Sequence, residues 1–293
     1  MSRLKQSVVS IADRLGCFSL GMAAQNALCP RGFIRVLSYH ATPAGLAAGF
    51  ERQLEFYSRH FAPAGPRDID SLIVGNWSAQ RPGLLITFDD GYRSNYDVAA
   101  PLLEKYGFRG CFFVPESFVA ESRDAADTAF ASSDPLEPEP RMTWAECADL
   151  EARGHRLGCH TRSHVRLSDR LSAEQLSDEI TMAGRDIGER LGRRIDDFCW
   201  VGGEEWSYGT AAFEEIRRAG YKRVFATNLL PVTTGSSPLW IERTNIEADW
   251  PLAQVRFYLS GLMDLAYGPK RRRLRKGRVP LHGPPTRQDS LGD

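Results

Sequence analysis

The stretch LLITFDDGY, residues 84–92, sets an apolar run directly against two adjacent aspartates and a glycine. An unbroken run of this kind is typical of a strand buried on both faces of a parallel sheet. Consecutive side chains of a strand point to opposite faces, so Asp89 and Asp90 can reach one cavity only if the strand has ended, and Gly91 permits that turn. Because burying an unpaired carboxylate costs on the order of several kcal/mol, something must compensate the two charges.

Strand-like and helix-like segments alternate on both sides of this stretch. Capping-box signatures at Thr143 with Glu146 and at Ser172 with Gln175 predict two helix starts, and a last helix is predicted over 250–266. About seven strand-helix units in a row predict an α/β fold in which a parallel sheet closes into a barrel with helices outside. The predicted strands cover residues 35–40, 84–88, 110–114, 155–160, 198–201, 222–227 and 239–243.

The chain of 293 residues divides by pattern into three parts. Residues 1–30 are predicted to form a helical extension, residues 31–268 the barrel, and residues 269–293 a basic, flexible tail. One long irregular stretch, residues 121–140, is acidic and contains prolines, which predicts a surface insertion or a flap beside the site. The expected organisation is therefore one large catalytic domain with short additions at its ends.

Charge and cysteine content limit the partners and the compartment. Lys plus Arg equals Asp plus Glu at 37 each, so no overall field favours a nucleic-acid partner. The first 28 residues contain Asp13 and Arg14 within their apolar part, which does not fit a signal peptide, and the six cysteines form no C-x-x-C pair. These features predict a cytoplasmic protein with reduced thiols.

A histidine pair lies about seventy residues beyond the two aspartates. In HTRSH, His160 ends a predicted strand and His164 follows four residues later, so both imidazoles could meet one ion if the segment coils into a helical turn. Carboxyl ends of parallel strands meet at one mouth of a barrel, which brings aspartate and histidines together. Two histidines and one carboxylate suit a divalent metal, zinc or another late transition metal, and leave the second aspartate as a base. The positive charge of the ion would also compensate the negative charge of the paired carboxylates.

Several motifs in order resemble the polysaccharide deacetylase family, that is, the NodB-homology or carbohydrate esterase family 4 proteins. They are TFDDGY, HTRSH, MTWAECADLEARGH before the histidines and AFEEIRRAGYKRVFATN after them, covering about residues 84–228. The resemblance implies a deformed (β/α)7 barrel of TIM-like, NodB type. It also implies that Asp89 is the base, that Asp90, His160 and His164 hold the metal, and that an N-acetyl group is removed from an amino-sugar glycan or a glycolipid precursor.

The sequence departs from the family pattern in two places. The third motif reads FCWVGGEEWSYG, with Val201 where proline is expected. The usual C-terminal Leu-x-His that supplies a general acid is not evident, because His282 lies beyond the basic tail. His40, in a YH pair like that of some members, is the preferred acid, although a core or capping role is an equal interpretation. His60 and His155 are assigned to structure.

Other interpretations remain open on the sequence. The same chemistry could serve another carbon-nitrogen bond that is not a peptide bond, as in a deformylase, or the altered third motif could mark a non-catalytic glycan-binding relative. The stretch KRRRLRKGR, residues 270–278, has seven basic residues in nine positions, which is typical either of a solvated end or of peripheral contact with the anionic inner face of a membrane. The predicted partners are thus a carbohydrate substrate and a lipid surface, without nucleic acid.

Overall fold

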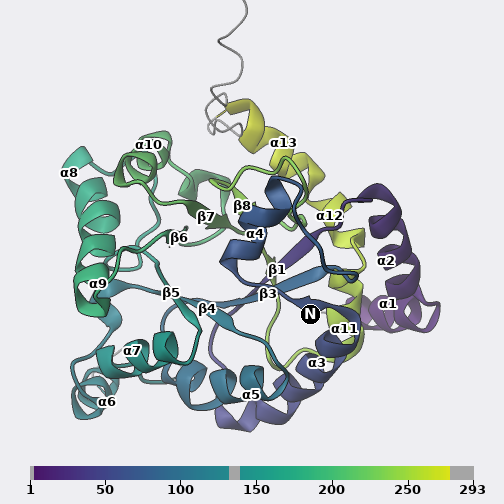
Figure 1. Ribbon diagram of the computed structural model, residues 1–293, viewed down its shortest axis with the longest axis horizontal. Helices are drawn as coiled ribbons and strands as arrows, with labels where there is room; N and C mark the ends of the chain where they lie inside the picture. The colour runs from purple at the N-terminus through teal and green to yellow at the C-terminus, as the bar shows by residue number, and fades with distance from the viewer. Residues whose placement is uncertain (1–2, 132–138, 278–293) are drawn as a thin grey trace, which may run out of the picture.

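A computed structural model of the chain describes residues 3–131 and 139–277. At its centre is a ring of short parallel strands with helices around the outside (Figure 1). The strands are β1 (Ile34–Tyr39), β2 (Ala62–Pro63), β3 (Gly83–Phe88), β4 (Gly110–Val114), β5 (Arg156–Cys159), β6 (Asp197–Cys199), β7 (Arg223–Ala226), β8 (Ile241–Glu242) and β9 (Thr244–Asn245).

The ring closes through a single extended segment, residues 241–245. The strand order is β8-β7-β6-β5-β4-β3-β1-β9, with β2 beside β3 and outside this path. Only Arg243 separates β8 from β9, and β8 pairs with β7 while β9 pairs with β1. The segment therefore joins both edges of the sheet and serves as the seventh strand position of the described barrel. This confirms the expected deformed (β/α)7 barrel.

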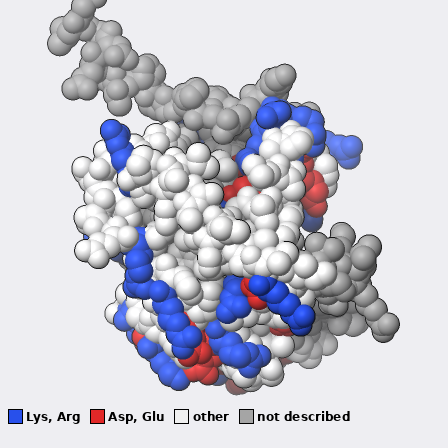
Figure 2. Space-filling model, turned by 90° about the vertical axis from the view of Figure 1, so that its right-hand side faces the viewer, with Lys and Arg blue, Asp and Glu red and all other residues white. Residues whose placement is uncertain are grey.

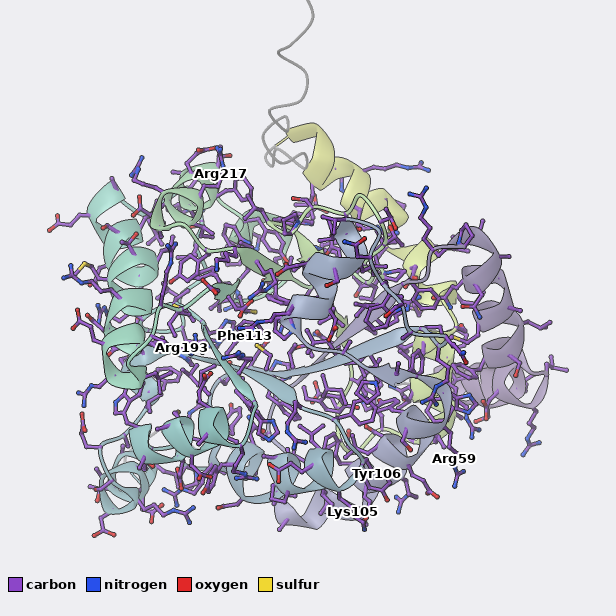
Figure 3. The ribbon with its side chains drawn as sticks, in the orientation of Figure 1. Arg59, Lys105, Tyr106, Phe113, Arg193 and Arg217 are labelled. Carbon is purple, nitrogen blue, oxygen red and sulfur yellow. The ribbon has the colours of Figure 1, made fainter. Side chains whose placement is uncertain are left out.

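The strands are apolar because helices cover their outer face and a second core fills the inside. Every residue of β1, β3 and β4 is buried, and Leu37 of β1 stands opposite Ile86 of β3. Inside, Phe113 and Phe225 pack with ring centroids 4.9 Å apart, and Figure 3 shows Phe113 within the ring of strands. Ile69 of helix α4 (Pro66–Ile73) belongs to this inner cluster. Helix α4 thus closes one end of the barrel and leaves the carboxyl ends of the strands for the site.

The outer helices begin where the sequence predicts. Thr143 caps helix α7 (Trp144–Ala152), with reciprocal hydrogen bonds of 2.7 and 3.2 Å to Glu146. Ser172 and Gln175 make the same exchange at the start of α8 (Ala173–Leu176). Both predicted capping boxes are confirmed. The other helices around the barrel are α3 (Ala47–His60), α5 (Ala100–Lys105), α9 (Ala183–Leu191), α10 (Thr210–Ala219) and α11 (Leu252–Leu259).

Three expectations about the edges of the barrel are wrong in part. The stretch 121–140 is not wholly irregular, because it contains helix α6 (Arg123–Ala131); residues 132–138 lie outside the described part. The last helix is broken at Gly261, whose φ of 86° ends α11 and starts α12 (Leu262–Ala266). The expected flexible tail is helical over α13 (Gly268–Gly277), where Lys270 and Arg271 bind backbone carbonyls of the barrel, and residues 278–293 lie outside the described part.

Two N-terminal helices, α1 (Arg3–Arg14) and α2 (Cys17–Leu28), pack against α11 on one flank of the barrel (Figure 1). A buried polar cluster connects α2 to the barrel and to α12. Arg35 of β1 is fully buried and points outward, where its guanidinium donates to Gln25 of α2 and, at 2.8 Å, to Asp264 of α12. A buried guanidinium without partners would destabilise the fold. The contacts of Arg35 therefore favour packing of α2 and α12 against the barrel.

Candidate active site

Asp89 and Asp90 stand where β3 ends and the chain turns. Asp90 and Gly91 have φ angles of 71° and 69°, in the left-handed region. This turn brings both carboxylates to the same mouth, as the sequence predicts for a strand that has finished. The turn is held because the Met142 amide donates to the Gly91 carbonyl at 2.8 Å. Asp89 and Asp90 are buried, with exposures of 4% and 7%.

His160 and His164 reach the same mouth on a loop rather than on a helical turn. His160 follows β5 directly, but Thr161 and His164 have φ angles of 66° and 59°, so the expected helical coiling of HTRSH is wrong. Glu179 holds the loop from outside by accepting hydrogen bonds of 2.9 Å from the amides of Arg162 and Ser163. The two imidazole rings nevertheless lie close, with centroids 5.1 Å apart.

Asp90, His160 and His164 form a compact set of metal-donor atoms. Asp90 Oδ1 lies 3.0 Å from His164 Nε2 and 3.5 Å from His160 Nε2, and it is buried without a hydrogen bond. Burial opposes ionisation of Asp90, but the two imidazoles outweigh it and bring the pKa of Asp90 well below its usual range. His160 Nδ1 lies 3.0 Å from the Cys199 carbonyl and donates a hydrogen bond to it, which leaves the lone pair of Nε2 available to bind a metal. One carboxylate oxygen and two ring nitrogens fit a divalent transition metal.

A second set of donors in the same place fits a cation poorly. Asp89, His160 and Cys199 also bring one donor atom each within reach of the others. Both oxygens of Asp89, however, are already bound to the guanidinium of Arg243. A cation at this second set would lie beside that guanidinium and be repelled by it. The set around Asp90 is therefore the candidate metal centre.

Arg243 is the main residue of the site that the sequence analysis missed. Its Nη1 and Nη2 each donate to one oxygen of Asp89 at 2.7 Å, and Nη1 also donates to Thr87 Oγ1 at 3.0 Å. Arg243 is 1% exposed and lies between β8 and β9. A charged residue inside the predicted strand 239–243 was the available signal, since a buried charge needs a partner. Arg243 therefore compensates the negative charge of Asp89, which is one of the two adjacent aspartates.

The electrostatic effect of Arg243 keeps Asp89 charged. Burial alone raises the pKa of the Asp89 carboxyl, but the charge and hydrogen bonds of Arg243, with the nearby His160, lower it below the usual value. Ser38 Oγ of β1 adds a contact of 3.2 Å to Asp89 Oδ2. Asp89 is thus an oriented carboxylate at neutral pH, fixed from three strands.

His40 lies at the same mouth, just beyond β1. Its Nδ1 is 3.3 Å from Glu247 Oε1, and its side chain is 39% exposed. Burial lowers the pKa of His40, but Glu247, Asp89 and Asp90 together outweigh burial and raise it above 6.5. The other candidate acid, His282, lies outside the described residues. A histidine with a raised pKa beside the site can supply a proton near neutrality.

The two histidines assigned to structure lie away from this mouth. His155 is fully buried, where its Nδ1 accepts from the Gly110 amide at 2.9 Å and its Nε2 lies 2.9 Å from Glu104. His60 packs against the rings of Phe18 and Phe56. Neither contacts the candidate metal centre, which agrees with their structural assignment.

All five predicted site residues line one cavity of about 230 Å³, together with Arg243. The predicted residues are His40, Asp89, Asp90, His160 and His164. Part of its wall is the third motif, which contributes Val201, Gly202 and Gly203. At the rim, Arg166 Nε donates to Glu204 Oε2 at 3.1 Å and lowers the pKa of Glu204 to about 2. The cavity therefore combines a candidate metal centre, a carboxylate and a histidine.

Comparison with known proteins agrees with this geometry. The polysaccharide deacetylase family profile matches residues 78–224. A putative polysaccharide deacetylase of Bacillus subtilis (strain 168) is 22% identical over 149 residues, 49% of this chain and 47% of that protein, so the chain spans about half the length of this curated relative.

Solved structures share the fold. A Streptococcus pyogenes deacetylase in complex with acetate superposes with a TM-score of 0.63 at 18% identity, covering 78% of this chain and 98% of that one. The protein IcaB from Ammonifex degensii gives 0.59 at 22% identity, covering 78% and 97%. Since the family profile covers half of the chain, the chain belongs to the polysaccharide deacetylase family.

Proposed function

We propose that this chain is a metal-dependent hydrolase that removes N-acetyl groups from an amino-sugar glycan or a glycolipid precursor. The observation that carries the proposal is Asp90 Oδ1, which is buried without a hydrogen bond between two imidazole nitrogens at 3.0 and 3.5 Å. A carboxylate oxygen that faces two imidazole nitrogens at this distance can share a divalent cation with them. Asp90, His160 and His164 would hold a divalent metal, with zinc as the best match to the donor set. A bound metal of this kind supplies Lewis acidity toward a carbonyl and brings the pKa of water to about 7.

The remaining residues would move and hold protons. Asp89 accepts the proton of the attacking water, because Arg243 keeps it ionised and oriented. Arg243 is a positioning residue, since its guanidinium contacts the base rather than the cavity's reacting groups. His40 gives a proton to the departing amine, which leaves poorly unless it is protonated. Glu247 holds the protonated ring of His40 toward this task.

The family and the cavity wall support the proposed substrate class. The matched family and the curated relative are both described as polysaccharide deacetylases. A cavity of about 230 Å³ with an open rim suits one acylated sugar residue, while neighbouring residues of a chain would lie outside. Trp206 is 54% exposed beside Arg166 and Glu204 at this rim, where a flat ring and polar groups can contact a sugar.

The test is mass spectrometry of N-acylated amino-sugar oligosaccharides before and after incubation with the metal-loaded chain. The proposal expects loss of the acetyl mass, with the Asp89→Asn variant as the inactive control that still binds metal. Parallel N-formyl substrates separate a deacetylase from a deformylase. If neither acyl group is released while the chain still binds the oligosaccharide, the protein is a glycan-binding relative and the proposed activity is refuted.

A further inference from the structure

Large exposed apolar side chains gather on one flank of the molecule, far from the active-site residues in the sequence. The described part of the chain has nine such side chains, and six of them lie on or between α1, α2 and α12. Leu28 is 81% exposed, Leu265 is 75% and Leu15 is 71%. We call this surface the flank face; its members are Ile11, Leu15, Leu20, Leu28, Leu262 and Leu265.

Helix α2 is apolar on both of its sides. On the inner side, Phe18 is buried and Gly21 packs so closely on the Ser260 backbone that a Cβ would lie 2.1 Å from its carbonyl oxygen. On the outer side, Leu20 and Leu28 face solvent with three alanines and the uncharged polar residues Ser19 and Asn26, and the helix has no charged residue. A surface helix of a soluble domain normally shows a polar outer face, so the outer side of α2 lacks the partner that its composition requires.

Basic residues outnumber acidic residues in the two sequence segments that include this flank. The segments 3–28 and 262–277 contain nine Lys or Arg but only two Asp or Glu, although the whole chain is neutral. Both acidic residues are in ion pairs, Asp13 with Arg256 at 3.1 Å and Asp264 with Arg35. Figure 2 shows the side of the molecule that bears this flank, with a broad area free of Lys, Arg, Asp and Glu; along its edges lie many Lys and Arg side chains, with some Asp and Glu among them.

We propose that the flank face docks on the surface of an anionic lipid bilayer. An apolar area bordered by Lys and Arg matches the acyl boundary and the charged headgroups of such a surface. No helix in the described residues is long and apolar enough to cross a membrane, so the contact is peripheral. A second copy of the chain is a poorer partner, because a twofold interface would set the same positive border against itself.

The proposal goes beyond the hydrolytic function and rests on different residues. Helix α13 connects the two regions, because its Lys270 donates to the carbonyl of Gly203 in the wall of the cavity while α13 itself follows α12. Docking through the flank face would thus hold the enzyme at a surface where lipid-linked saccharides reside. Membrane contact is assigned to the folded helices α1, α2 and α12 in addition to the basic C-terminal segment.

The experiment is flotation of the full chain with vesicles of phosphatidylcholine alone or with about one third phosphatidylglycerol. The chain should float with the anionic vesicles. A triple variant, Leu20→Gln, Leu28→Gln and Leu265→Gln, should lower the partition coefficient about tenfold or more, because each leucine contributes its own apolar contact. Arg272→Gln should lower it about fivefold or less. All four side chains are exposed, so the fold should be unaffected.

Matched controls exist elsewhere on the surface. Val74, which directly follows α4 and is not part of the flank face, is 69% exposed, so Val74→Gln should leave flotation unchanged, and Arg170→Gln is the control for charge. Failure of the wild-type chain to float with anionic vesicles, or equal flotation of the triple variant, would overturn the proposal. A dimer in sedimentation that the triple variant abolishes, without vesicle binding, would assign the face to a second copy and overturn it as well.

Discussion

The two adjacent aspartates at the barrel mouth have opposite surroundings. Asp89 meets a guanidinium that contacts both of its oxygens at 2.7 Å, and the two charges balance without any further ion. Asp90 meets two imidazoles and keeps one buried oxygen without a hydrogen bond. The difference teaches that adjacent carboxylates can serve different roles: Asp89 is paired with a fixed guanidinium, whereas Asp90 faces two imidazole nitrogens that could share a cation with it. We therefore assign proton transfer to the Asp89–Arg243 pair and metal binding to the Asp90–His160–His164 cluster.

The largest effect is expected from breaking the Asp89–Arg243 pair. Arg243→Met leaves a buried carboxylate without its partner, which should lower the free energy of unfolding by about 3–5 kcal/mol. Chemical denaturation followed by circular dichroism measures this change. The double variant with Asp89→Asn should recover part of the loss, because the unpaired charge is then removed. If the single and double variants are equally stable, Arg243 does not compensate Asp89.

Removing the base while keeping its shape should affect rate and not metal. Asp89→Asn is expected to lower turnover by about 10² to 10⁴, the range for loss of a general base. Metal content measured on the same preparation should stay at the wild-type value, since Asp89 is bound to Arg243. Loss of the metal together with the fall in turnover would show that Asp89 is a metal ligand. The two aspartates would then not have separate roles.

Replacing the proposed acid should have a smaller effect. His40→Ala is expected to lower turnover about 10²-fold with metal content unchanged, because other proton donors such as water replace the imidazole incompletely. The His40 side chain is partly exposed, so the fold should persist, and the melting temperature of the variant is the control for folding. Unchanged turnover would contradict the assignment of His40 as the acid and leave His282 as the remaining candidate.

The smallest effect concerns the pH dependence. Burial lowers the pKa of His40, while Glu247 and the two aspartates raise it to a net value above 6.5. An acid must be protonated, so turnover should fall as the pH rises through this pKa. Glu247→Gln removes one of the contributions that raise the pKa of His40, and the alkaline fall of kcat should therefore move to lower pH. A move to higher pH would contradict the assignment of His40 as the acid.

The parts of the site that are local in sequence were predictable. The end of β3 at Phe88, the turn at Gly91 and the arrival of His160 at a strand end all follow from neighbouring residues. The barrel follows from repeated strand-helix units, and so does the meeting of Asp90 with His160 and His164 at one mouth. Nearby residues carry this information because strand length and turns depend on short-range patterns.

The parts that depend on distant contacts were not predictable. Arg243 lies 154 positions from Asp89 in the sequence, and no local sequence pattern predicts that these two buried charges will form a pair. Similarly, HTRSH forms a loop because Glu179, sixteen positions away or more, binds its amides, which overrides the helical spacing of the two histidines. The break at Gly261 and the helical form of α13 also depend on packing against the barrel, including Gly261 beside Gln25 and Arg35.

Metal analysis of the purified chain and its variants tests the central claim most directly. The account predicts one divalent ion per wild-type chain, retained in Asp89→Asn and lost in Asp90→Ala, His160→Ala and His164→Ala. Each variant should keep its circular dichroism spectrum, so that metal loss is not loss of fold. Stoichiometric metal in all three alanine variants, or its loss in Asp89→Asn alone, would contradict the division of the site into a proton-transfer pair and a metal-binding cluster.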